Sequence, residues 1–213
     1  MPKFDHHLHT TRYSPDSILE PEELIERARE VGLDGVVITE HDHQWEAAEL
    51  AELAEKAGGL VVLSGAEISA REGHCLVYGL PNLDEVPPGI CVAELCALVR
   101  SQGAAMVAAH PFRWDQDFDD ILHANGPAFE ALELVSNNVT AATRHQTERV
   151  LREYPTLGAT GSSDGHDRGT IGCYYTEFPG TIATIADFVA ALKARAGRPR
   201  HRVGATLASG PVG

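Results

Sequence analysis

Histidines and carboxylates recur where strands of this sequence are expected to end, and such side chains could bind metal ions. His7 and His9 stand two residues apart in DHHLHT, a spacing that places both on one face of a strand. Both rings could therefore bind one ion, while Leu8 faces the other way. Asp164 and His166 repeat the spacing in SSDGHD, on a loop. Mixed imidazole and carboxylate ligands suit zinc, manganese or iron, not calcium.

The other candidate ligands are single residues, and each has a plainer structural alternative. Glu67 could bridge two cations with its two oxygens, or it could accept a hydrogen bond from an imidazole. His41 could cap a helix, His110 could be a core histidine at a strand end, and His74 begins a strand where the others end one. The set indicates a metal site more strongly than any one member does, because most of its members follow expected strands and should meet at the carboxyl-terminal edge of one sheet.

Apolar runs alternate with helical periods along the chain, which predicts strand–helix units around a parallel sheet. We expect strands at 4–9, 35–40, 60–69, 73–80, 104–110, 128–135, 156–161 and near 171–178. We expect helices from Pro21 to Gly32, at 44–57, and near 92–102, 116–124, 139–153 and 182–195. About seven such units favour an α/β barrel of the TIM kind, in which the active site lies at the carboxyl ends of the strands.

Composition limits the classes of protein that fit. A chain of 213 residues is long enough for one large domain or two small ones. We place a single domain at 1–196 and expect 197–213 to be a flexible or loosely packed tail. The net charge of −14 disfavours a long nucleic-acid duplex as partner. No apolar run reaches the roughly 20 residues of a membrane span. The start, MPKFDHHLHT, lacks an apolar signal segment, so we expect a cytoplasmic protein.

The ordered motifs DHHLHT, ITEHD, GAEIS, AAHPFR and GSSDGHD resemble those of the PHP (polymerase and histidinol phosphatase) family. The resemblance covers Phe4 to about Phe178 and is to small, single-domain, metal-dependent phosphoesterases. It implies a distorted (β/α)7 TIM-like barrel and two or three divalent ions of manganese, iron or zinc. Glu40 stands where the family usually has aspartate, and we expect it to support the ligands. The metal ligands that the resemblance implies are His7, His9, Asp16, His41, Glu67, His74, His110, Asp164 and His166.

The implied reaction is hydrolysis of a small phosphate ester. Several cations close together lower the pKa of a bridging water and clamp a phosphoryl group, so we expect attack by a metal-activated hydroxide. Asp164, His166 and Arg113 are the expected catalytic residues. Arginine forks suit phosphate oxygens, which makes Arg113, Arg12 and Arg168 candidate ligands of the substrate phosphate.

Several alternatives stay open at this point. The ester could be a phosphomonoester, a nucleotide or a short oligonucleotide end, and the oligomeric state cannot be read. Histidinol-phosphatase-type activity is an alternative, although no long insertion would shape a dedicated pocket. A non-catalytic metal-binding module is disfavoured by the complete ligand set. An amidohydrolase-type C–N hydrolase often has a bridging lysine, and Lys3, Lys56 and Lys193 all lie away from the expected strand ends.

Residues near the motifs receive supporting roles. We expect His6 to face outward, Asp42 to cap a helix or support a ligand, and Asp167 to cap a helix or a turn. Ser162 and Ser163 are interpreted as supporting donors, because no base accompanies them. Three aromatic residues could stack a base, although packing is the plainer role for each: Phe112, Trp114 and Trp45.

Overall fold

The computed structural model describes residues 1–116, 118–125 and 128–202 of the chain. Its strands are β1 (Lys3–Asp5), β2 (Gly35–Ile38), β3 (Val61–Ser64), β4 (Ala66–Ala70), β5 (Gly73–Tyr78), β6 (Ala105–Ala108), β7 (Ala131–Val135), β8 (Gly158–Gly161), β9 (Tyr174–Glu177) and β10 (Arg198–His201). Its helices are α1 (Pro21–Glu30), α2 (Ala47–Glu55), α3 (Val92–Ser101), α4 (Phe118–Asn125), α5 (Ala141–Glu153) and α6 (Ile185–Lys193).

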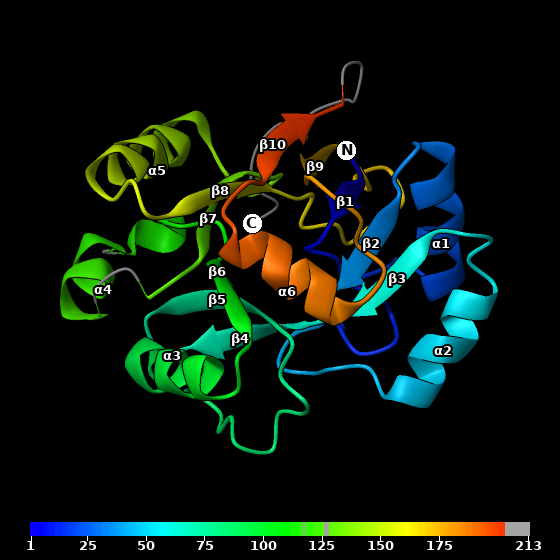
Figure 1. Cartoon of the computed structure of the whole chain (residues 1–213), viewed down its shortest axis with the longest axis horizontal. Coiled ribbons are helices and arrows are strands. Elements are labelled where there is room, and N and C mark those ends of the chain that lie inside the picture. Colours follow the sequence, from blue (N-terminus) through cyan, green and yellow to red (C-terminus); the bar gives the residue numbers. More distant parts are fainter. Residues whose placement is uncertain (117, 126–127, 203–213) are drawn as a thin grey trace.

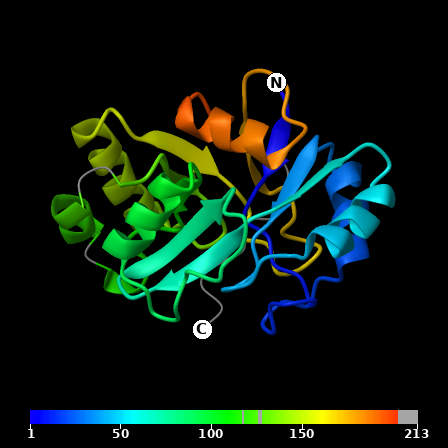
Figure 2. The same cartoon turned by 60° about the horizontal axis from the view of Figure 1, so that its bottom comes forward.

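The strands form two five-stranded sheets, in the orders β10-β9-β1-β2-β3 and β4-β5-β6-β7-β8 (Figures 1 and 2). The predicted α/β class is confirmed. The expectation of a parallel sheet holds for β1-β2-β3 and for β6-β7-β8. It is wrong for β5, which runs against both β4 and β6, and for β9, which runs against β1. The connection Arg71–Glu72 is too short for a crossover helix, so β4 and β5 pair as a hairpin.

The two sheets meet where the expected strand 60–69 divides. Gly65 separates β3 from β4, and a Cβ atom there would lie 2.6 Å from the carbonyl oxygen of Val77. Beyond the break, an isolated bridge joins His41 to Glu67. A second bridge, Leu8 to Gly165, connects the sheets on the other side. Within the described residues no continuous ladder joins the two sheets, so the seven-unit closed barrel is not found.

Helix α6 lies across the junction of the two sheets (Figures 1 and 2). Its Phe188 packs against Phe4 of β1, Tyr78 of β5 and Phe178, with ring centroids 5.0–5.7 Å apart. Thr184 caps the helix by accepting a hydrogen bond from the amide of Asp187. This aromatic cluster fills the end of the fold opposite His7 and His9, which follow β1 at its carboxyl end.

His6 belongs to that interior, and the expectation that it faces outward is wrong. Its ring is fully buried, with Nδ1 2.9 Å from the hydroxyl of Tyr78 and Nε2 3.2 Å from that of Thr176. Burial lowers the pKa of His6 to about 4, so the imidazole is neutral at ordinary pH. Alternation did turn His6 away from His7, but toward the inner cluster under α6.

The chain beyond Gly197 differs from the expected loose tail in its first residues. Arg198–His201 form β10 and pair antiparallel with β9, so the domain extends past residue 196. The rest of the expected tail, 203–213, lies outside the described residues. Within the described part of the chain, no helix combines the length and apolar character that crossing a membrane requires.

Candidate metal centre

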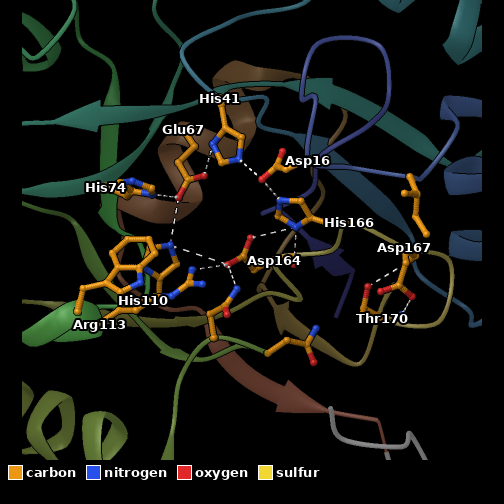
Figure 3. Close-up of a pocket in the computed structure, with 14 residues that line it drawn as sticks. Asp16, His41, Glu67, His74, His110, Arg113, Asp164, His166, Asp167 and Thr170 are labelled. Atoms are coloured by element: carbon orange, nitrogen blue, oxygen red, sulfur yellow. Dashed lines mark hydrogen bonds and ion pairs between the residues drawn. The ribbon is translucent and has the colours of Figure 1, made fainter. Parts of the chain in front are cut away.

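All the predicted ligands lie in one cavity of about 690 Å³ or directly beneath it. Figure 3 shows those that line the cavity. The first sheet contributes residues that follow β1 and β2, and the second contributes residues of β4 and β5 and residues that follow β6 and β8. The ligands that line the cavity or lie beneath it are His7, His9, Asp16, His41, Glu67, His74, His110, Asp164 and His166.

Glu67 lies at the centre of this group, and its carboxylate is buried. Oε1 is 2.9 Å from Nδ1 of His74 and 3.2 Å from Nε2 of His110. Oε2 is 2.9 Å from Nδ1 of His41 and 3.3 Å from Nε2 of His9. The two oxygens face different imidazoles, so Glu67 can bridge two ions.

Asp164 forms the second buried carboxylate of the centre. Its Oδ1 lies 3.3 Å from Nε2 of His7 and 3.5 Å from Nε2 of His9. Asn138 donates a 2.5 Å hydrogen bond to Oδ2, which fixes the carboxylate. The backbone of Asp164 has a φ of 52°, a conformation uncommon outside glycine that clusters at functional sites.

Asp16 extends the group toward the cavity mouth. Its Oδ2 lies 3.1 Å from Nε2 of His41 and 3.2 Å from Nε2 of His166 (Figure 3). Three sets of donor atoms, each set within 4.8 Å, could hold an ion: His7, His9 and Asp164; His7, Glu67 and His110; and His9, His41 and His166. The sets share members, as expected for a cluster of ions and not for separate sites.

The protonation of the deepest imidazoles fits a cation. Ser14 donates its hydroxyl proton to Glu40 at 2.6 Å, so it must accept the bond from Nδ1 of His9 at 3.2 Å. That leaves a lone pair on Nε2 of His9, an atom that is buried without a hydrogen-bond partner. Nε2 of His7 is buried in the same way, while its Nδ1 is 3.1 Å from Glu133. A buried imidazole nitrogen that faces a carboxylate and has no hydrogen-bond partner is suited to bind a divalent ion through its lone pair.

Without cations, the negative charges of the centre hold protons instead. Burial disfavours the charged form of His7, but Asp164 and Glu67 outweigh that effect and raise its pKa well above the ordinary value. Burial also opposes the charged form of His41, yet Glu67 and Asp16 raise its pKa to about 9. Cations must displace these protons to bind.

Glu133 of β7 is a supporting residue that the sequence interpretation missed. Its carboxylate is buried; Oε1 accepts a 2.6 Å bond from Ser162 and lies 3.1 Å from Nδ1 of His7. Oε2 accepts a 2.8 Å bond from the amide of His110. A lone carboxylate inside the apolar strand ALELV was the available signal. Glu133 therefore fixes two candidate ligands from behind.

The structure places the three candidate arginines differently. Arg113 lines the cavity, with Nη1 3.9 Å from Oδ2 of Asp164. Arg12 pairs with Glu49 of α2, and Arg168 pairs with Glu30 of α1 at 2.6 Å. Neither lines the cavity, because carboxylates on the neighbouring helices hold both guanidinium groups on the surface. Of the three, only Arg113 lines the cavity that holds the predicted ligands.

The remaining motif residues mostly have the expected supporting roles. Asp167 caps its turn by accepting from the amides of Gly169 and Thr170. Asp42 accepts from the amide of Ser69 at 2.8 Å, so it supports β4 and does not cap α2, which begins at Ala47.

Glu40 also supports the ligands. It accepts hydrogen bonds from Thr10, Ser14 and the indole of Trp45, and does not line the cavity.

Two family models match this chain. The model of the PHP domain matches residues 5–166, and a model described as PHP-associated matches residues 144–196. The first range holds every candidate metal ligand, from His7 to His166.

Solved structures share the fold at low sequence identity. PsfC from Pseudomonas syringae superposes with a TM-score of 0.70 at 22% identity, over 96% of this chain and 94% of that one. A candidate metal-dependent phosphoesterase from Bifidobacterium adolescentis gives 0.64 at 21% identity, over 90% and 96%. An amidohydrolase from Chromobacterium violaceum gives 0.66 at 17% identity, over 93% and 97%. These likenesses concern the fold alone.

Sequence relatives include proteins much longer than this chain. An uncharacterised protein of Methanocaldococcus jannaschii is 32% identical over 120 residues, which cover 52% of this chain and 68% of the relative. A 5′-3′ exoribonuclease of Haemophilus influenzae is 35% identical over 104 residues, which cover 48% of this chain and 35% of the relative. With the domain matched over residues 5–166 and its ligands converging on one cavity, the chain belongs to the PHP domain family.

Proposed function

We propose that this protein is a metal-dependent phosphoesterase that hydrolyses a small phosphate ester. The observation that carries the proposal is the pair of buried carboxylates, Glu67 and Asp164, facing imidazole nitrogens that have no hydrogen-bond partner. Such a centre fits two or three divalent ions of manganese, iron or zinc. When bound, the ions supply an activated water and neutralise charge on a phosphoryl group.

The chain's own residues would orient the ligands and the substrate. Glu133 and Ser14 hold the rings of His7 and His9 so that each Nε2 points to the centre. Arg113 lies beside Asp164 at the edge of the cavity, where its guanidinium can donate to a non-bridging phosphate oxygen. The ester would therefore bind with its phosphoryl group toward the buried floor and its leaving alcohol toward the open mouth.

We further propose a nucleotide or a short oligonucleotide end as the ester. The similarity to part of a 5′-3′ exoribonuclease favours this class. A cavity of about 690 Å³ lies in the range of roughly 300–1,000 Å³ that small-molecule ligands occupy. The net charge of −14 disfavours a long duplex, so the cations would attract the phosphate locally. We also propose that the two five-stranded sheets correspond to a distorted barrel that is interrupted at the two isolated bridges.

A substrate panel on protein of known metal content tests this proposal. Phosphate monoesters, phosphate diesters, 5′-AMP, short oligonucleotides, histidinol phosphate and amide substrates are assayed before and after chelation, and again after each metal is restored. We expect phosphate-ester hydrolysis that chelation abolishes and metal restores. Arg113→Ala should lower kcat/KM by about tenfold or more, and Arg12→Ala, a surface arginine paired with Glu49, is the matched control. Cleavage of amides alone would refute the proposal.

A further inference from the structure

Trp114 stands out at the mouth of the cavity because its side chain is exposed. Its exposed fraction is 60%, whereas Trp45 is 8% exposed, and Phe112 is also buried. Trp114 lines the cavity that holds the candidate metal ligands, and Trp45 instead donates its indole N–H to Glu40. Of the three aromatic residues that could stack a base, only Trp114 presents its ring to the cavity.

The loop that carries Trp114 holds an unusual backbone. His110, Phe112 and Trp114 have φ values of 28°, 67° and 56°, in the region that bulky residues rarely adopt. Phe112 anchors the loop, because its buried ring packs on Phe118 of α4 with centroids 5.6 Å apart. Strain of this kind persists only when the surroundings enforce it. The loop therefore holds the backbone of Trp114 in place and leaves its indole exposed.

The indole of Trp114 lies beside the guanidinium of Arg113, the group proposed to bind the substrate phosphate. The guanidinium carbon of Arg113 lies 4.1 Å from the centroid of the Trp114 ring, and Nη1 of Arg113 lies 3.9 Å from Asp164. The rings of His74 and His110 lie 5.2 Å and 5.6 Å from the indole, at steep angles to it. One guanidinium thus separates the buried carboxylate from the indole. Figure 3 shows Arg113 beside His110, across the cavity from Asp16.

We propose that Trp114 is a stacking platform for a planar aromatic ring carried by the substrate's leaving alcohol. The chemical class is a nucleoside phosphate or an aryl phosphate, since both offer a ring a short distance from the phosphoryl group. This inference rests on the proposed phosphoesterase function, because the phosphate anchors the ring against the indole. Stacking needs no base-edge contacts, so the platform would favour aromatic esters without selecting one base.

Binding of non-hydrolysable phosphonates to the metal-loaded protein tests the inference apart from activity. Three analogues are compared: that of 5′-AMP, benzylphosphonate, and the analogue of ribose 5-phosphate, which lacks a ring. We expect the two ring-bearing analogues to bind about tenfold more tightly than the ribose analogue and to quench indole fluorescence. Because the chain has two tryptophans and Trp45 is buried, the quenched signal belongs to Trp114.

Variants of Trp114 then test whether its indole causes the preference for ring-bearing analogues. Trp114→Ala should remove both the preference and the quenching, and Trp114→Phe should keep the preference. Ile18→Ala is the matched control, since Ile18 is the other large exposed apolar residue that lines the cavity, and it should keep both. Equal binding of all three analogues to the wild type overturns the stacking inference and leaves the phosphoesterase proposal standing. A preference for the adenine analogue alone also overturns it, in favour of base-edge recognition. If none binds, both proposals fall.

Discussion

Single side chains of the candidate centre are fixed from behind by buried polar partners. Glu133 holds His7, and Ser14 with Glu40 holds His9, so neither imidazole can turn its Nε2 away from the two central carboxylates. Supporting contacts of this kind fix the tautomer and orientation of metal-binding histidines. The affinity of the centre for cations should therefore depend on residues that touch no cation.

Substitution of Glu133 tests that dependence. Glu133→Gln keeps the size of the side chain but loses a charge and one acceptor, so we expect metal affinity to fall by about 10- to 100-fold. Titration with metal measures this, and circular dichroism checks the fold. Glu130→Gln is the matched control, because Glu130 accepts from the amide of Met106 and does not line the cavity. Equal metal affinity in both variants would contradict the assigned role of Glu133.

The charge state of His41 gives a prediction on pH. Its pKa is raised to about 9 in the metal-free protein, so the ring is protonated at pH 7.5 and must lose that proton before it can bind a cation. Metal affinity should rise as pH increases toward 9, and metal binding at pH 7.5 should release protons. Calorimetry in buffers of different ionisation enthalpy counts the protons. Binding without proton release would show that this assignment is wrong.

At the scale of elements, local sequence patterns predicted where helices end and which side chains share a face, but not how the strands pair. Alternation correctly placed His7 and His9 together, and a glycine correctly ended the helix before Leu33, because both signals act over neighbouring residues. The direction of β5 and the break at Gly65 depend on contacts with other strands, which periodicity does not record.

Among the functional residues, the same limit applies. Glu133 was missed because its partner His7 is 126 residues away. Arg12 and Arg168 lie near the motifs in sequence, but carboxylates on α1 and α2 hold them elsewhere. The motifs therefore predicted which side chains come together, while contacts distant in sequence determined their support and the position of each arginine.

Helix α6 should make a large contribution to stability through one residue. Phe188 is fully buried against rings of β1 and β5, so Phe188→Ala should lower the free energy of unfolding by about 3–5 kcal/mol. Denaturant titration gives the value. Lys193→Ala, at the exposed end of the same helix, removes one exposed hydrogen bond from Nζ to the carbonyl oxygen of Gly103 and should change it by about 1 kcal/mol or less. Similar effects of the two substitutions would contradict the packing described for α6.

At the scale of the whole molecule, the centre joins the two sheets. His7, His9 and His41 follow strands of the first sheet, whereas Glu67 lies in the second sheet and His110 and Asp164 follow its strands. Cations bound between them would connect the sheets at the positions of the two isolated bridges. A ligand that binds only the folded chain stabilises it by mass action.

Metal removal should therefore lower the thermal stability of the whole domain. At a metal concentration of 100 times Kd, the expected stabilisation is about 2.7 kcal/mol for one bound ion. Scanning calorimetry of chelated and reloaded protein measures it, and Asp164→Asn should reduce the difference. Identical unfolding temperatures with and without metal would contradict a centre that spans the two sheets.

The central claim is that buried Glu67 and Asp164 hold the cations on which phosphate-ester hydrolysis depends. Release of inorganic phosphate from 5′-AMP, measured against the number of metal ions bound per chain, tests it most directly. We predict that the rate rises with occupancy to a plateau at two or three ions, and that Asp164→Asn lowers kcat by about 100-fold or more because a ligand of the cluster is lost. Hydrolysis that persists without bound metal, or a fully loaded protein that hydrolyses neither phosphate monoesters nor phosphate diesters, would contradict the claim.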